Sequence, residues 1–82
     1  MELKGKTALV TGGTDGIGLE IARQMMAKGA TVIVCGRRED VLASARQEGL
    51  EAIQADLSTA SGCAELAAAL AGRGLDILIN NA

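Results

Sequence analysis

Short apolar runs alternate with segments of helical periodicity along the whole chain. Four runs read as strands because each is almost continuously apolar, as strands buried on both faces of a parallel sheet are. They cover residues 7–10, 31–35, 52–55 and 76–80. With helices between them, the order is β-α-β-α-β-α-β, which predicts a parallel sheet with right-handed crossovers and helices on its faces.

The segments between the runs carry the signals of three helices. The first has an apolar stripe that begins at Ile17 and stops at Gly29. A second helix is expected over 38–48 and a third over 58–71, with Ser58 as the N-cap of the third. Because ligands of such folds bind beyond the carboxyl ends of the strands, we expect a binding site at these ends.

Composition indicates one small globular domain and excludes several classes of partner. The chain has 82 residues, of which 49% are hydrophobic and 22% charged, with a formal net charge of -2. This charge, without a dense Lys/Arg cluster, argues against binding of nucleic acid. The apolar runs are far shorter than the roughly 20 residues that span a bilayer, and no signal-peptide pattern follows the N-terminus. We therefore expect no membrane association and a cytoplasmic location.

The two cysteines, Cys35 and Cys63, fit a reducing compartment. Cys35 lies in an apolar run and Cys63 in a helical pattern, so both are expected to be small buried residues rather than a disulfide pair. Neither has a metal-ligand spacing to another Cys or to acidic residues, and the chain contains no His. No metal site is predicted.

Glycines crowd the boundary between the first strand and the first helix, in the stretch "TGGTDGIG". Free N–H groups and the positive end of the dipole favour an anion at a helix N-terminus, so a pyrophosphate would sit here. Gly12 permits a tight exit from the strand, Gly16 lets the backbone approach the ligand, and Gly18 lets the helix pack close to the sheet. The spacing G-x-x-x-G-x-G differs from the G-x-G-x-x-G fingerprint and from a P-loop. An ordinary strand-to-helix turn is the alternative interpretation.

Four stretches in order, "TGGTDGIG", "VCGRR", "ADL" and a terminal "NNA", resemble the nucleotide-site elements of the short-chain dehydrogenase/reductase family. The resemblance covers the whole chain. It implies a Rossmann-like three-layer αβα fold with sheet order 3-2-1-4, the N-terminal half of the family fold. It further implies that residues 1–82 form a partial dinucleotide-binding domain whose cofactor is a nicotinamide dinucleotide.

The resemblance also implies which residues bind the cofactor. Asp56 matches the family's acidic residue that faces the adenine, with Leu57 beside the ring, although an acid at a helix start is a compatible alternative. Asn80, Asn81 and Ala82 match the family's N-N-A-G without its final glycine. The full predicted set is Thr11, Gly12, Thr14, Asp15, Gly16, Ile17, Gly18, Gly36, Arg37, Arg38, Asp56, Leu57, Asn81 and Ala82.

The tip of the second strand favours NADP(H) over NAD(H). A carboxylate there would bind the ribose 2'-hydroxyl of NAD, whereas arginine accommodates a 2'-phosphate. Gly36 stands where the acid would be expected, and Arg37 and Arg38 follow. The alternative is that both arginines are solvated and paired with the acids at 39–40. Asp15 also argues against NADP(H), because an acid in the glycine stretch would weakly repel the extra phosphate.

No catalytic residue is predicted in this chain. The family resemblance implies hydride transfer between the cofactor and an alcohol or carbonyl substrate, performed with a serine, a Tyr-x-x-x-Lys pair and an asparagine from segments after N-N-A-G. The chain contains no Tyr. We therefore expect the cofactor-binding N-terminal part of an NADP-dependent oxidoreductase, inactive alone. A stand-alone nucleotide-binding or assembly module without chemistry of its own is the alternative.

The predicted sheet order places the strand at 76–80 on an outer edge, where its unpaired N–H and C=O groups would be a template for another chain. We expect self-association through Ile77 and Ile79, or face to face, and hence a homo-oligomer.

Overall fold

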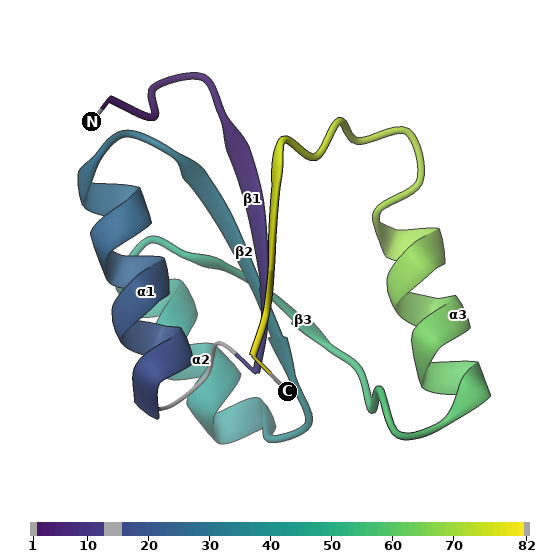
Figure 1. The fold of residues 1–82 in the computed structure, drawn as a ribbon. Coiled ribbons are helices and arrows are strands. Elements are labelled where there is room, and N and C mark those ends of the chain that lie inside the picture. The colour runs from purple at the N-terminus through teal and green to yellow at the C-terminus, as the bar shows by residue number, and fades with distance from the viewer. Residues whose placement is uncertain (1, 13–15, 82) are drawn as a thin grey trace.

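Four parallel strands form one sheet in the order β3-β2-β1-β4 in the computed structural model, which describes residues 2–12 and 16–81 (Figure 1). The strands are β1 (Thr7–Thr11), β2 (Thr31–Gly36), β3 (Glu51–Gln54) and β4 (Ile77–Asn80). The helices between them are α1 (Gly16–Ala27), α2 (Glu39–Gln47) and α3 (Ala60–Ala69). The predicted order of elements and the predicted sheet order 3-2-1-4 are confirmed.

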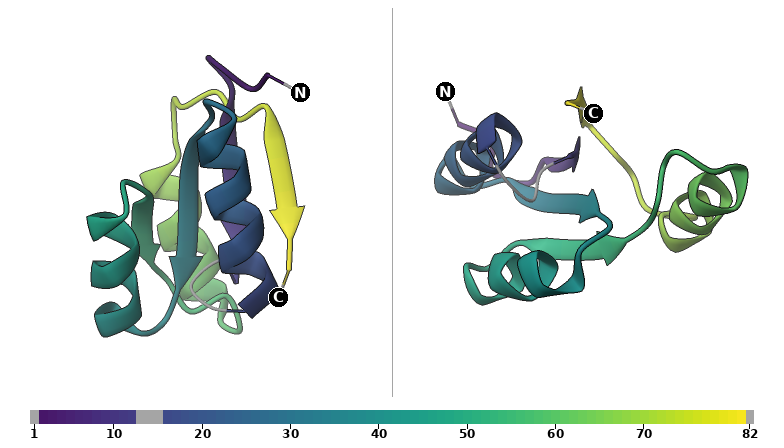
Figure 2. Two further views of the ribbon diagram at one scale, coloured as in Figure 1. Left: turned by 90° about the vertical axis from the view of Figure 1, so that its left-hand side faces the viewer. Right: turned by 90° about the horizontal axis from the view of Figure 1, so that it is seen from below.

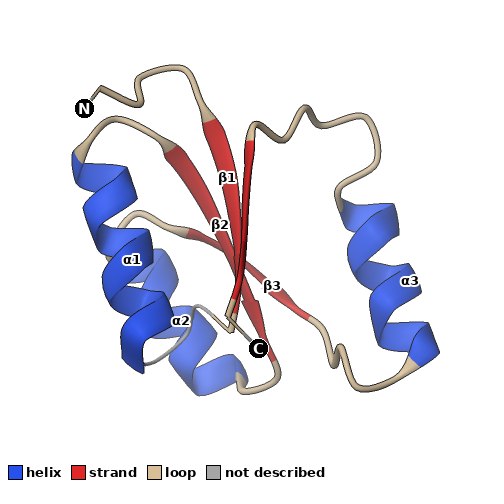
Figure 3. Ribbon diagram, in the orientation of Figure 1, coloured by secondary structure: helices blue, strands red, loops and turns tan. Residues whose placement is uncertain are grey.

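The helices lie on both faces of the sheet, so the molecule has three layers. Figure 2 shows α1 and α2 together on one face and α3 alone on the other. Figure 3 shows that the strands run side by side between these two layers. This arrangement confirms the Rossmann-like αβα class and explains why the strand sequences are apolar on both faces. None of the helices in the described part of the chain is long and apolar enough to cross a membrane.

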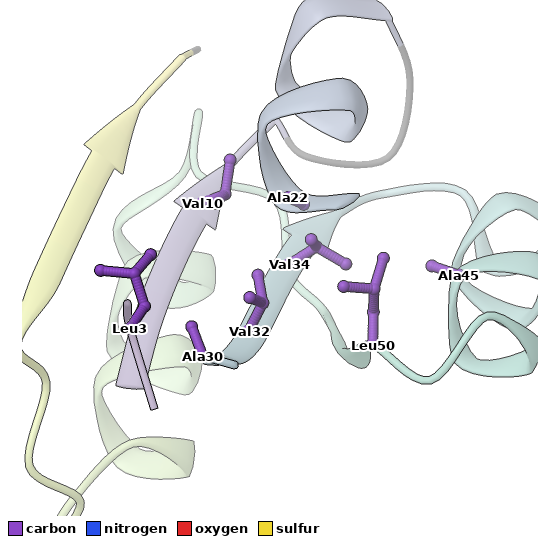
Figure 4. Close-up of a cluster of buried hydrophobic side chains, with 8 residues drawn as sticks. All are labelled: Leu3, Val10, Ala22, Ala30, Val32, Val34, Ala45 and Leu50. Atoms are coloured by element: carbon purple, nitrogen blue, oxygen red, sulfur yellow. The ribbon is translucent and has the colours of Figure 1, made fainter. Parts of the chain in front are cut away.

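The sheet divides the hydrophobic core into two clusters. The first cluster packs between the sheet and α1 and α2 (Figure 4), and consists of Leu3, Val10, Ala22, Ala30, Val32, Val34, Ala45 and Leu50. The second cluster lies toward α3 and consists of Leu9, Ile33, Cys35, Ala55 and Leu66. Adjacent strand residues belong to opposite clusters, as the two-residue period of a strand requires. The core contains no aromatic ring, because the chain has none.

The start of α3 differs from the prediction. The helix begins at Ala60, and its N-cap is Thr59, whose hydroxyl oxygen accepts a hydrogen bond of 2.9 Å from the Gly62 N–H. The predicted cap, Ser58, is wrong because its hydroxyl donates instead to the carboxylate of Asp56, at 2.6 Å. Both residue types can cap a helix, and the contact with Asp56 decides between them.

Only one of the two cysteines is buried. Cys35 is 1% exposed in the second cluster, as expected, and both thiols are free. Cys63 is exposed, which corrects the expectation of a buried residue. The buried positions of α3 are Gly62 and Leu66, one turn apart on the face toward the sheet. Cys63 follows Gly62 directly, so the 100° step of the helix turns it away from this face.

Strand β4 forms one edge of the described sheet and presents different side chains to its two faces. Ile77 and Ile79 are partly buried and pack against the first cluster. Leu78 is 63% exposed, and its register partner on β1 is Leu9 of the second cluster. The most accessible apolar side chain of this strand is therefore Leu78, whereas Ile77 and Ile79, through which edge-to-edge association is expected from the sequence, are partly buried.

Candidate dinucleotide-binding site

The carboxyl end of β1 leads into the glycine segment and then into α1. Gly12 and Gly16 have φ angles of +65° and +58°, a left-handed backbone conformation that residues other than glycine rarely adopt. A Cβ built on Gly16 meets no atom within 4 Å, so the backbone there is open to a ligand. The predicted residues Thr14 and Asp15 lie outside the described residues, as does Ala82 at the end of the chain.

Gly18 lies where α1 comes closest to the end of the sheet. A Cβ on this residue would collide with the carbonyl oxygen of Gly12 and would come within 2.6 Å of the Nδ2 atom of Asn81. Glycine is therefore required here by close packing, as the sequence predicts for this position. The contact also brings Asn81, from beyond β4, to the glycine segment, two parts of the chain that the sequence alone separates widely.

Thr11 connects β1 to the end of β4. It is only 7% exposed, and its hydroxyl donates a hydrogen bond of 3.0 Å to Oδ1 of Asn80. The same oxygen accepts a hydrogen bond of 3.1 Å from the Asn81 N–H. Asn80 belongs to the "NNA" stretch but not to the predicted set of cofactor-binding residues. Its hydrogen bond with Thr11 adds it to the residues of the candidate site. Together these bonds join the carboxyl end of β1 to the end of β4.

A second part of the candidate site is an open pocket at the ends of β2 and β3. Its volume is about 270 Å³, and its lining residues are Arg37, Gln54, Ala55, Asp56 and Glu65. The predicted residues Arg37 and Asp56 meet in this pocket although they follow different strands. Gly36, the last residue of β2, carries no side chain that could place a carboxylate beside them.

The two arginines after β2 have different surroundings. Arg37 lines the pocket. Arg38 instead pairs with Asp40 at 2.9 Å, and both side chains are about 70% exposed, at 73% and 70%. The hydrogen bond from Arg38 is the main reason that the pKa of Asp40 lies below its ordinary value. Both arginines are exposed, so the alternative interpretation is right about solvation. Pairing with Asp40 involves Arg38, whereas Arg37 lines the pocket.

The Asp56 carboxylate is held in its ionised form. Ser58 donates to its Oδ1 atom twice, from the hydroxyl at 2.6 Å and from the backbone N–H at 3.0 Å. These bonds lower the pKa of Asp56, and the positive charge of Arg37 lowers it further. Leu57, the next residue, is partly buried against the second cluster. The carboxylate can therefore accept hydrogen bonds from a ligand in the pocket.

The remaining predicted residue of the first helix, Ile17, is 74% exposed beside the glycine segment. Sequence reasoning missed Gln54 and Glu65, which also line the pocket. Gln54 precedes the "ADL" stretch directly, so its position at the carboxyl end of β3 was a usable signal. Glu65 lies within α3, and nothing in the sequence pattern connects it to this pocket.

These residues fit a dinucleotide on chemical grounds. An open glycine backbone at a helix start suits a diphosphate, and a guanidinium and a carboxylate in one pocket suit a phosphorylated ribose and a base. The family model described as "short chain dehydrogenase" matches residues 6–82. The chain belongs to the short-chain dehydrogenase family.

Individual members of the family resemble the chain in sequence and in structure. An uncharacterized oxidoreductase of Bacillus subtilis, YvaG, is 43% identical over 89 residues, covering 99% of this chain and 33% of that protein. A solved structure of a short chain dehydrogenase/reductase family protein has a TM-score of 0.90 and 49% sequence identity. The match covers 100% of this chain and 35% of the chain in that structure. The Pseudomonas aeruginosa RhlG/NADP active-site complex has a TM-score of 0.88 and 43% identity, over 99% of this chain and 36% of its own. The chain thus spans about a third of the length of these relatives.

Proposed function

We propose that residues 1–82 form a dinucleotide-binding domain that prefers NADP(H) to NAD(H). It would serve an oxidoreductase that transfers hydride between the nicotinamide and an alcohol or carbonyl substrate. The observation that carries the proposal is the position of Arg37, whose side chain lines the pocket beyond β2 and β3 while Gly36 supplies no carboxylate. A relative solved as an NADP complex, 43% identical to this chain, supports the choice of cofactor.

The described residues bind and orient the cofactor in this proposal. The backbone at Gly12 and Gly16 and the first turn of α1 hold the diphosphate, because free N–H groups and the helix dipole favour negative charge there. Asp56 accepts hydrogen bonds from the adenine, with Leu57 against the ring. When bound, the nicotinamide supplies the hydride. None of the described residues is assigned a catalytic role.

The preference for the 2'-phosphate follows from charge and geometry. A guanidinium can donate two parallel hydrogen bonds to phosphate oxygens. NAD would offer Arg37 only a ribose hydroxyl, and that hydroxyl would find no carboxylate at Gly36 to accept a hydrogen bond from it. The Asp40 carboxylate already engages Arg38, so Arg37 is the primary phosphate ligand of the pair.

Calorimetric titration of the chain with NADP+ and with NAD+ tests the proposal. Arg37→Ala should weaken NADP+ binding about 10- to 100-fold, the range for charged hydrogen bonds, and leave NAD+ binding unchanged. Lys28→Ala is the matched control, because it removes the same charge from an exposed residue at the opposite, amino-terminal end of β2. Equal affinities for the two dinucleotides, unaffected by Arg37→Ala, would overturn the preference.

A further inference from the structure

The end of β3 continues its hydrogen-bond ladder to β2 with a side chain. Gln54 is the register partner of Gly36, the last residue of β2. The next backbone bond runs from the Ala55 N–H to the Gly36 carbonyl at 2.9 Å. Beyond this point the side-chain amide of Gln54 takes over, because its Nε2 atom donates a hydrogen bond of 3.0 Å to the carbonyl oxygen of Arg37. The carbonyls of Gly36, at the end of β2, and of the next residue therefore accept hydrogen bonds from Ala55 and Gln54, at the end of β3.

This contact acts on the short link between β2 and α2. Arg38 is the N-cap of α2, and its side chain makes no capping hydrogen bond. The backbone of Arg38 is held by α2 instead, because its carbonyl oxygen accepts a hydrogen bond of 3.0 Å from the Leu42 N–H. Gln54 anchors the residue between the strand and the cap, and that residue is Arg37.

Gln54 and Arg37 also line the same pocket. A fixed carbonyl restricts the backbone torsions of Arg37 and so restricts where its guanidinium can lie. A side chain that is already placed loses less conformational freedom on binding, and affinity rises accordingly. This gain in affinity applies only to a ligand that the guanidinium of Arg37 contacts.

We propose that Gln54 is a positioning residue for cofactor choice: by holding the Arg37 carbonyl, it presents the guanidinium to the 2'-phosphate of NADP(H). The inference rests on the proposed function, since it assigns a device for selectivity to the same pocket. Gln54 acts through Arg37, so its loss should affect the dinucleotide that carries the 2'-phosphate and spare the one that does not.

The deciding variant is Gln54→Met, which keeps the length of the side chain and removes the amide donor. The ratio of the NAD+ to the NADP+ dissociation constant should fall about two- to tenfold, the value of one neutral hydrogen bond, through weaker NADP+ binding alone. Gln24→Met is the matched control, because it removes an exposed amide that donates to Glu20 on α1, at 3.0 Å. The ratio in the control should equal that of the wild type.

The possible results separate this inference from the proposed function. A wild type that binds neither dinucleotide contradicts the proposed function and this inference with it. A wild type that prefers NADP+, together with a Gln54→Met variant that keeps the same preference, overturns this inference alone. Equal weakening of both dinucleotides also overturns it, because a purely structural role of Gln54 would lower both affinities together.

A measurement without cofactor gives a second check. Backbone order parameters from ¹⁵N relaxation report picosecond-to-nanosecond motion of the link at 36–38. They should fall in Gln54→Met and stay at the wild-type values in Gln24→Met. Unchanged order in Gln54→Met would show that the amide does not restrain Arg37 and would overturn the inference even if the affinities changed.

Discussion

The side-chain amide of Asn81 packs directly over the backbone of Gly18, at a distance that leaves no room for a methyl group. A Cβ on Gly18 would lie 2.6 Å from the Asn81 Nδ2 atom and would collide with the Gly12 carbonyl. The amide belongs to a flexible side chain and can move, whereas the carbonyl belongs to the backbone of the glycine segment and cannot move without changing the turn. Helix α1 and the residue after β4 therefore meet at a position where close packing requires glycine.

Replacing Gly18 by Ala should destabilise the chain in spite of the better helix propensity of alanine. Propensity alone would stabilise α1 by about 1 kcal/mol. Overpacking at a tight contact costs about 1–3 kcal/mol and should outweigh this gain. Urea unfolding followed by circular dichroism measures the difference. Gly74→Ala is the control, since a Cβ there meets no atom within 4 Å. An unfolding midpoint for Gly18→Ala at or above that of Gly74→Ala would contradict the packing argument.

Asp40→Asn should strengthen binding of NADP+ and leave NAD+ unchanged. The substitution releases Arg38 from its 2.9 Å ion pair and makes a second guanidinium available beside Arg37. We expect a two- to fivefold gain, roughly the size of one exposed ion pair, which shrinks as salt screens the charges. Glu39→Gln is the matched control, because it removes the neighbouring acid, which pairs with Arg46 instead. Equal gains in both variants would trace the effect to net charge, not to Arg38.

The ion pair between Glu51 and Arg73 should make stability depend on acidic pH. Arg73 donates to both carboxylate oxygens, at 2.6 and 3.0 Å, and these bonds hold the pKa of Glu51 below its ordinary value. A carboxylate whose pKa is lowered in the folded state stabilises the fold fully above its unfolded pKa of about 4.3. This stabilisation is lost as the pH falls through the folded pKa.

Glu51→Gln therefore should lower the free energy of unfolding at pH 7, by a small amount because both side chains are partly exposed. The difference from wild type should begin to shrink as the pH falls below the unfolded pKa of about 4.3, and should vanish only below the lowered folded pKa, where the wild-type carboxylate is protonated in both states. Denaturant titrations at several pH values measure this, with Glu65→Gln as a variant that removes an exposed carboxylate of α3. A difference that stays constant from pH 7 to pH 3 would contradict the assignment to this pair.

Leu78→Lys should reduce self-association without unfolding the chain. Leu78 is 63% exposed on the edge strand, and exposed apolar side chains beside unpaired strand groups favour association. Ile79→Lys is the informative comparison, because Ile79 packs against the first cluster and its replacement should lower stability. Sedimentation velocity at about 100 μM, above the micromolar range where exposed edges associate, measures both. A wild type that stays monomeric there would contradict the expected homo-oligomer.

The sequence predicts the sheet well because the apolar runs are the strands. The inner strands β1 and β2 are buried on both faces, as their continuous apolar runs predict. The edge strands β3 and β4 are only partly buried, although their runs also read as strands. The ends of elements were less predictable. Whether Ser58 or Thr59 caps α3 depends on the bonds that Ser58 makes to Asp56, and a local pattern contains no information about that competition.

The candidate site divides in the same way. Gly18 could be predicted, because its role depends on the absence of a side chain. Arg37 and Arg38 are equivalent in sequence, and only their surroundings separate the pocket residue from the partner of Asp40. Gln54 escaped prediction because its hydrogen bond joins two segments that are 17 positions apart. The cofactor contacts of the whole predicted set stay predictions.

The central position of β1 sets an order for assembly. Its first neighbour, β2, follows after one helix, but its second neighbour is β4, and the Thr11 hydroxyl reaches Asn80 across 69 positions of chain. Closing so long a loop costs entropy before the contacts formed there return any stability, which slows folding. On a ribosome, β1 would be synthesised first and yet would keep one edge unpaired until residues 77–80 emerged. The hydrogen bonds of Thr11 with Asn80 and Asn81 therefore form only after β4 has been synthesised, later than the pairing of β1 with β2.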